Sequence, residues 1–201
     1  MLLEGKGLGF RYDRRGVWLF RDRELSVSAG EIVGLAGPSG CGKTTLAKLL
    51  AGCAAPEEGE VRFDGKPLLE VKGCSPVQLV FQHPERAVNP RWRMRQIVEE
   101  GGRPEPLLLD AMGIAEEWLD RRPSELSGGE LQRFCIARAL GGQTRMLIAD
   151  EMTTMLDAVT QAQIWNTVLG VVRQRELGLL VISHERPLLH RLCDRIVEWK
   201  S

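Results

Sequence analysis

The stretch Gly37–Thr45 has the residue types and spacing of a phosphate-binding loop. Its sequence, GPSGCGKTT, fits the pattern G-x-x-x-x-G-K-[ST], and an apolar run precedes it while a helical pattern follows. Glycines let successive backbone N–H groups turn toward phosphate oxygens, and the new helix points its positive end at the same anion. Lys43 is expected to reach the β- and γ-phosphates and the Thr44 hydroxyl to bind Mg²⁺. The residues expected to contact a nucleotide are Gly37, Ser39, Gly40, Cys41, Gly42, Lys43, Thr44 and Thr45. The alternative, a chance match in a glycine-rich turn, is disfavoured by the flanking strand and helix patterns.

Two adjacent carboxylates, Asp150 and Glu151, follow directly on the apolar run Met146–Ala149. Neighbouring side chains leave a strand in different directions, so one carboxylate can hold Mg²⁺ while the other faces an attacking water. Phosphoryl transfer needs that division, because positioning and charge neutralisation supply most of the catalysis. We therefore assign Asp150 to the metal and Glu151 to the general base. The alternative is a pair of exposed turn carboxylates.

Gln82 and His184 also follow apolar runs, residues 77–81 and 179–182. His184 could donate a hydrogen bond to the γ-phosphate, although a single histidine is usually structural. Gln82 carries an even weaker signal when it is taken alone.

Ser127, Gly128 and Gly129 stand at the predicted start of a helix. Ser127 can cap that helix, with Glu130 three residues on as its capping-box partner. Two glycines at a helix start also expose backbone N–H groups, which makes a second candidate anion site.

These residues need a scaffold that gathers them, and hydrophobic patterning predicts one. Strands alternating with helices indicate a largely parallel α/β sheet, whose ligands bind beyond the carboxyl ends of the strands. Because Gln82, Asp150, Glu151 and His184 all follow buried strands, we expect them to share one site. Expected strands cover residues 2–10, 18–27, 32–36, 60–63, 77–81, 146–149, 179–182 and 195–199. Expected helices cover residues 43–51, 94–100, 107–112, 158–175 and 187–192, with another starting at Ser127.

Within this pattern, residues 2–10 and 18–27 are expected to pair as antiparallel strands. Residues 84–125 change character, with many prolines and charges, and we expect a small helical lobe inserted into the core.

Composition narrows the class of protein. Lys plus Arg is 27 and Asp plus Glu is 27, and this balance argues against a nucleic-acid partner. Five scattered cysteines without a C-x-x-C pair favour reduced thiols in the cytoplasm. No segment approaches the roughly 18 apolar residues of a membrane span, and the N-terminus lacks the apolar run of a signal peptide. Any membrane role would therefore come through a partner.

Taken together, the motifs resemble those of ABC-type ATPase domains, in the same order and over essentially the whole chain. The matching segments are Gly37–Thr45, Gln82, Leu126–Glu130, Leu147–Glu151, Leu156–Asp157 and His184. The resemblance implies an α/β P-loop NTPase (RecA-like) core with a mainly parallel sheet, an N-terminal antiparallel β subdomain and a small inserted helical subdomain. It implies one domain over residues 1–201, with residues 1–83 and 143–201 forming the core and β subdomain. Residues 84–142 would then form the helical lobe and signature helix.

The resemblance also implies a head-to-tail dimer that sandwiches two ATP molecules. The phosphate loop of one subunit would face Ser127, Gly128 and Gly129 of the other. Tyr12 matches the aromatic residue that stacks on adenine, although it could be an ordinary strand aromatic. Asp157 matches a loop that communicates across the dimer. Gln82 matches the residue that contacts Mg²⁺ and links ATP to the helical lobe, so with Lys43, Glu151 and His184 it completes the expected catalytic set.

A narrower resemblance is to the dipeptide, oligopeptide and nickel importer ATPases, carried by Val80–Pro84 with Ala87–Pro90 and by Leu156–Ala158 with Thr160–Gln163. It implies an ATP-hydrolysing subunit on the cytoplasmic face of the cell membrane, bound to permease subunits and paired with a second copy or a paralogue. Met152 and Met155 replace the commoner Pro and Ala after Glu151, which should be tolerated. The alternatives are an ABC-type ATPase of repair or translation, a small-molecule kinase with a phosphate loop, and a regulatory module without turnover.

Overall fold

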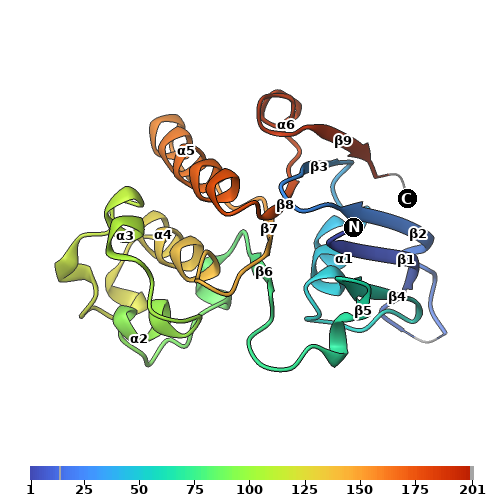
Figure 1. The fold of residues 1–201 in the computed structure, drawn as a ribbon, viewed down its shortest axis with the longest axis horizontal. Helices are drawn as coiled ribbons and strands as arrows, with labels where there is room; N and C mark the ends of the chain where they lie inside the picture. Colours follow the sequence, from blue (N-terminus) through green and yellow to red (C-terminus); the bar gives the residue numbers. More distant parts are fainter. Residues whose placement is uncertain (14, 200–201) are drawn as a thin grey trace.

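The computed structural model describes residues 1–13 and 15–199, so residues 14, 200 and 201 of the predicted core lie outside the described residues. Two sheets and a helical lobe make up this part of the chain (Figure 1). The two sheets lie on either side of helix α1 (Lys43–Leu50), and the helical lobe lies at the opposite end of the molecule from the antiparallel sheet.

The first sheet is antiparallel, with strand order β2-β1-β4-β5. Strand β1 (Leu3–Phe10) pairs with β2 (Phe20–Val27) on one side and with β4 (Glu58–Phe63) on the other. The predicted antiparallel pairing of the first two strands is confirmed. The short strand β5 (Lys66–Pro67) turns back on β4 through Asp64 and Gly65, which have φ angles of 52° and 76° as a tight hairpin turn requires.

The second sheet is parallel throughout, with order β6-β7-β8-β3-β9. Its strands are β3 (Ile32–Ala36), β6 (Val77–Val80), β7 (Met146–Asp150), β8 (Gly178–Ile182) and β9 (Arg195–Glu198). Every residue of β3, β7 and β8 is buried, because the sheet is covered on both faces and so accepts continuous apolar runs. The predicted mainly parallel sheet is confirmed.

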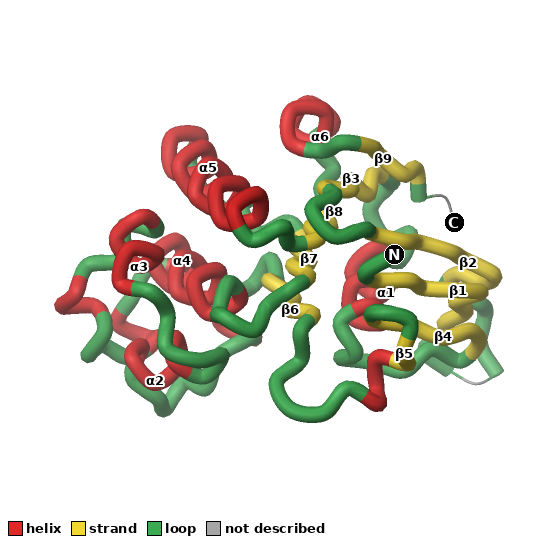
Figure 2. The backbone as a smooth tube through the Cα atoms, in the orientation of Figure 1, coloured by secondary structure: helices red, strands yellow, loops and turns green. Residues whose placement is uncertain are grey.

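One face of the parallel sheet packs against α1 and the antiparallel sheet, and helices cover the other face. The lobe carries α2 (Met94–Glu99), α3 (Pro106–Ala111) and α4 (Gly128–Ala139), and Figure 2 shows only helices and loops between them. The two remaining helices, α5 (Ala158–Gln174) and α6 (Arg186–Leu192), follow β7 and β8. The predicted helices all occur, with ends that differ by at most one residue.

The lobe shares its core with the sheet. Met94, Ile97 and Phe134 of the lobe are fully buried, and they belong to one apolar cluster with Leu147 and Val181 of the sheet. A second cluster joins the other face of the parallel sheet to α1 and the antiparallel sheet. This continuity fits a lobe inserted into the core, while the division at residues 84–142 remains a prediction.

Candidate nucleotide site

The loop between β3 and α1 has the backbone geometry that its glycines allow. Gly42 precedes α1 with φ 93°, a left-handed value that L side chains rarely adopt. At Gly37 the reason is space, because an added Cβ would clash with the carbonyl oxygen of Trp199. The sequence therefore has glycine at these two positions for different physical reasons.

Lys43 is nearly buried and lies folded back on the loop. Its Nζ donates hydrogen bonds to the carbonyl oxygens of Gly37 and Pro38, at 2.7 and 2.8 Å. These contacts hold the ammonium group over the loop. Both acceptors are neutral carbonyl oxygens, so the positive charge of Lys43 is available to a phosphate.

Asp150 and Thr44 form an oxygen pair at the end of β7. The Asp150 residue is 4% exposed, and burial raises the pKa of its carboxyl, while a hydrogen bond with the Thr44 hydroxyl opposes that rise. A hydroxyl and a carboxylate beside a phosphate loop fit Mg²⁺, which takes one or two protein oxygens and completes its octahedron with phosphates and water. Within residues 1–13 and 15–199 no cluster of three His, Cys, Asp or Glu could bind a metal by itself.

Glu151 and His184 lie in contact. The Nδ1 atom of His184 is 3.3 Å from Oε1 of Glu151. The backbone of Glu151 has φ 49°, which is strained for a residue with a side chain, and its N–H is bonded to the carbonyl oxygen of Ile182 at 3.0 Å. Sequence reasoning placed both residues at the sheet edge but did not pair them.

Gln82 joins the same group through a residue that sequence reasoning missed. Its Nε2 donates to Thr154 Oγ1 at 3.4 Å, and that hydroxyl donates to the carbonyl oxygen of Glu151 at 3.0 Å. From the lobe, Gln132 Nε2 donates to the carbonyl oxygen of Phe81 at 3.1 Å. A short chain of hydrogen bonds therefore runs from α4 through the end of β6 to the loop after Glu151.

One open cavity of about 660 Å³ gathers most of the predicted residues. Its lining consists of Tyr12, Leu19, Ser39, Gly40, Gly42, Lys43, Thr44, Thr45, Gln82, Glu151 and His184. Tyr12 is 80% exposed at the rim, and its hydroxyl is 2.9 Å from Thr45 Oγ1. An exposed ring at this position is free to stack on a base. Leu19 is the one lining residue that the sequence did not indicate.

Ser127, Gly128, Gly129 and Asp157 do not line this cavity. Ser127 caps α4 with the predicted capping box, since its backbone N–H donates to Glu130 Oε2 at 2.7 Å and its hydroxyl accepts from Glu130 N. Asp157 caps α5 through Oδ1, which accepts from the N–H groups of Val159 and Thr160. Both helix starts remain available to a partner from outside the subunit.

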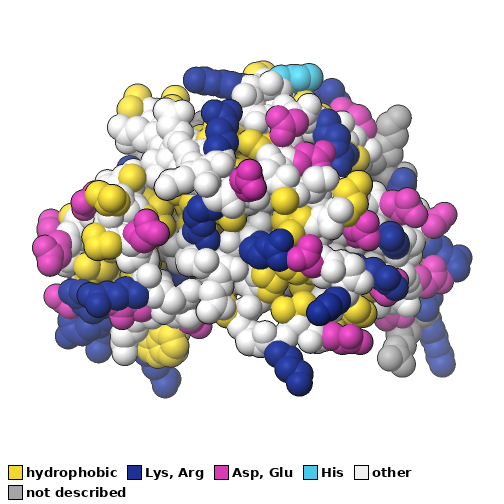
Figure 3. Space-filling view, in the orientation of Figure 1, with side chains coloured by type: hydrophobic (Ala, Val, Ile, Leu, Met, Phe, Trp, Pro, Cys, Tyr) yellow, Lys and Arg dark blue, Asp and Glu magenta, His cyan; other side chains and the backbone are white. Residues whose placement is uncertain are grey.

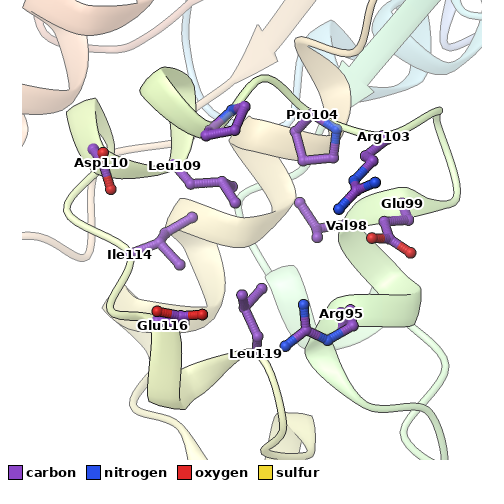
Figure 4. Close-up of a pocket in the computed structure, with 11 residues that line it drawn as sticks. Arg95, Val98, Glu99, Arg103, Pro104, Leu109, Asp110, Ile114, Glu116 and Leu119 are labelled. Carbon is purple, nitrogen blue, oxygen red and sulfur yellow. The ribbon is translucent and has the colours of Figure 1, made fainter.

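A second cavity, of about 280 Å³, lies in the helical lobe (Figure 4). Val98, Leu109, Ile114 and Leu119 supply apolar walls, as Figure 4 shows. Charged side chains stand around them, with Arg95, Glu99 and Arg103 on one side and Asp110 and Glu116 on the other. This cavity holds none of the predicted nucleotide-binding residues.

The distribution of surface charge and the lengths of the helices both agree with what the sequence predicts. Figure 3 shows basic and acidic side chains interspersed over the face in view, as the zero net charge suggests. In the described part of the chain, each helix is too short or too polar to cross a membrane.

Comparison with known proteins identifies relatives over most of the chain. Residues 20–154 match the family model described as "ABC transporter". The chain is 36% identical over 207 residues to the nickel import ATP-binding protein NikE of Escherichia coli strain K12, covering 94% of this chain and 77% of that protein. It is 38% identical over 191 residues to the protein of the same name from Shigella dysenteriae serotype 1, covering 86% and 71%.

A solved structure shares the fold. It is an ATP-binding cassette determined as a dimer in a post-hydrolysis state with ADP and Pi. It superposes with a TM-score of 0.84 at 23% identity, over 99% of this chain and 94% of that one. The predicted α/β fold of the P-loop type is confirmed.

Proposed function

Because the chain belongs to the ABC transporter family, as an ATPase subunit of the importer type, we propose that it powers uptake by closing a head-to-tail dimer over two ATP molecules. One observation carries this proposal. The cavity gathers the phosphate loop, Glu151 and His184, whereas the second helix start at Ser127 lies outside it. Each subunit would therefore hold half of each site.

In the proposed reaction the loop N–H groups and Lys43 bind the phosphates, and Thr44 with Asp150 holds Mg²⁺. When bound, Mg²⁺ would neutralise charge on the β- and γ-phosphates. Glu151 accepts a proton from the attacking water as the water oxygen bonds to the γ-phosphorus and the bond to the bridging oxygen breaks. His184, 3.3 Å away, orients Glu151 and donates to the γ-phosphate. ADP and phosphate then leave as the dimer opens.

The cross-subunit half of the site would be Ser127 with the N–H groups of Gly128 and Gly129. The capping box fixes the start of α4, and the hydrogen bonds that Ser127 makes to Glu130 lower the pKa of that carboxyl, so Glu130 stays ionised in its capping role. Asp157, at the start of α5, would contact the partner subunit across the dimer, and Tyr12 would stack on adenine.

For cargo, we propose nickel or a nickel chelate, with peptides as the second candidate. The support is the likeness to the two nickel import proteins, together with the importer-type segments Val80–Pro84 and Thr160–Gln163. The partners would be permease subunits, and the location the cytoplasmic face of the membrane. The lobe cavity, with apolar walls and charges of both signs, suits an amphipathic permease segment (Figure 4).

The decisive experiment uses Glu151→Gln, which keeps the size of the side chain but removes the base. With ATP and Mg²⁺ this variant should elute as a dimer in size-exclusion chromatography, and without nucleotide as a monomer. Glu24→Gln, an exposed change on β2, is the matched control and should hydrolyse ATP normally. A Glu151→Gln protein that binds ATP but stays monomeric counts against the closing dimer. Permease subunits that co-purify with the chain would identify the cargo system.

A further inference from the structure

Trp199 contacts the phosphate loop from behind, from the end of the last strand. The residue is 3% exposed, and its indole Nε1 donates a hydrogen bond to the carbonyl oxygen of Cys41 at 3.0 Å. Its backbone N–H donates to the carbonyl oxygen of Ala36, just before the loop, at 2.6 Å. Trp199 and Cys41 are 158 residues apart in sequence, so neither local pattern indicates the contact.

The indole itself is held in place by its surroundings. The ring of Phe20 meets it edge to face, with centroids 5.4 Å apart and planes at 81°. The guanidinium carbon of Arg23, which lies on β2 like Phe20, is 5.6 Å from the centroid of the Trp199 ring. The donor therefore has a fixed direction, and it points at one carbonyl of the loop.

That carbonyl determines where a neighbouring N–H group points. The peptide bond between Cys41 and Gly42 is planar and trans, so its C=O and N–H point in opposite directions. Drawing the Cys41 oxygen toward the buried indole turns the Gly42 N–H the other way, toward the cavity that Gly42 lines. This is one of the N–H groups that the loop is expected to offer to phosphate.

Other loop carbonyls are held differently. Gly37 and Pro38 accept from Lys43, whose ammonium group is itself expected to bind phosphate. The indole is not expected to contact phosphate, so its bond to Cys41 can persist with nucleotide bound. Donors that are already oriented bind more tightly, because less ordering remains to be done on binding.

We propose that Trp199 is a positioning residue for phosphate binding, acting through the Cys41 carbonyl to orient the Gly42 N–H. This inference rests on the proposed nucleotide site, but it does not depend on dimer closure or transport. It adds to the expected site a residue that lies beneath the loop and outside every motif.

The test compares two tryptophans. Trp199→Phe keeps an aromatic ring against Phe20 and removes the donor. Trp165→Phe is the matched control, because Trp165 is 4% exposed and its Nε1 also makes one hydrogen bond, to Thr153 Oγ1 at 3.1 Å. The dissociation constant for ADP is measured by calorimetry, since ADP binding requires neither hydrolysis nor a second subunit. Circular dichroism establishes that both variants are folded at the temperature used.

Trp199→Phe should weaken ADP binding by about five- to tenfold, the loss expected for one net hydrogen bond, while Trp165→Phe leaves it unchanged. The KM for ATP should rise by a similar factor with kcat within about twofold, because the contact is made in both ground and transition states. A purely structural role would lower the amount of active enzyme, and so kcat, without changing KM. Equal ADP affinities of wild type and Trp199→Phe, or a fall in kcat alone, would overturn the proposal.

Should Trp199→Phe fail to fold, benzothienylalanine introduced at position 199 replaces the indole N–H by sulfur and keeps the ring size. The same ADP measurement on that protein decides the question. If wild-type protein itself fails to bind ADP, the proposed function is wrong. If wild type binds and the variant binds equally well, only the role of Trp199 is wrong.

Discussion

His184 Nδ1 lies 3.3 Å from Glu151 Oε1, although the two residues are 33 positions apart. The contact follows from the sheet, because β7 and β8 are parallel neighbours and Asp150 is in register with Ile182. Each polar side chain lies just past its strand, on the same edge. The proposed general base and its proposed orienting partner thus follow two different strands, and they meet because the sheet places those strands side by side.

The His184–Glu151 contact predicts a large catalytic role for the histidine. We expect His184→Ala to lower kcat for ATP hydrolysis by about 10²-fold or more, the range for loss of one preorganised hydrogen-bond donor to developing charge, while ADP affinity changes little. Steady-state ATPase assays with calorimetric ADP binding check this. His190→Ala, an exposed histidine on α6, is the control and should behave as wild type. A variant at position 184 with full turnover would remove His184 from the site.

Lys43 bonds to two loop carbonyls in the structure and is proposed to bind phosphate, and its replacement should affect both. Lys43→Ala removes a charged donor to phosphate and frees the carbonyls of Gly37 and Pro38. Loss of a charge-assisted hydrogen bond corresponds to about 10- to 150-fold weaker ATP binding. Equilibrium binding of a fluorescent ATP analogue measures it, with the exposed Lys66→Ala on β5 as control. Unchanged affinity would remove the phosphate-loop assignment.

Ser127 allows a test of the cross-subunit arrangement. Ser127→Arg should place a bulky cation at the start of α4 and leave little ATPase activity. Lys43→Ala should also be inactive, because it lacks the charged donor to phosphate. In a head-to-tail dimer of the two variants, one site receives both defects and the other receives neither. Mixing the two proteins should therefore restore up to about half of the wild-type turnover per mixed dimer.

The control for this mixture is each variant mixed with itself at the same total concentration. Activity that does not rise on mixing Ser127→Arg with Lys43→Ala contradicts the trans arrangement.

The elements were predictable because their signals are local. Fully apolar runs mark β3, β7 and β8, and glycine with Lys43 marks the loop, so strand, turn and helix can be assigned from short windows of sequence. The gathering of Gln82, Glu151 and His184 also followed, since parallel strands present their carboxyl ends together.

Contacts that depend on strand order were not predictable. The His184–Glu151 pair requires β8 beside β7, and the Trp199–Cys41 bond requires β9 beside β3. Thr154 was missed because a threonine in a loop carries no pattern of its own; its role arises from Gln82 on one side and the Glu151 carbonyl on the other. Tertiary geometry, not propensity, determines these three contacts.

Glu31 joins β3 to β9 and gives the fold a predictable response to acid. Its carboxylate accepts from Ser28 N at 2.7 Å and from Arg195 Nε at 2.6 Å. Burial alone would raise the pKa of Glu31, but these two hydrogen bonds outweigh it and hold the pKa below its usual value. A carboxyl whose pKa is lower in the folded state stabilises the fold above its unfolded pKa. That contribution is lost as the pH falls through the folded pKa.

Glu31→Gln should therefore lower the free energy of unfolding by about 0.5–1 kcal/mol at pH 7, a value kept small because the side chain is partly solvated. The difference from wild type should shrink steadily below about pH 4.5, as Glu31 of the wild type becomes protonated and loses its charge. Urea unfolding followed by circular dichroism between pH 3.5 and pH 7 measures both proteins. Glu24→Gln, exposed on β2, gives the baseline. A difference that persists unchanged at the acid end would show that shape rather than charge joins the two strands.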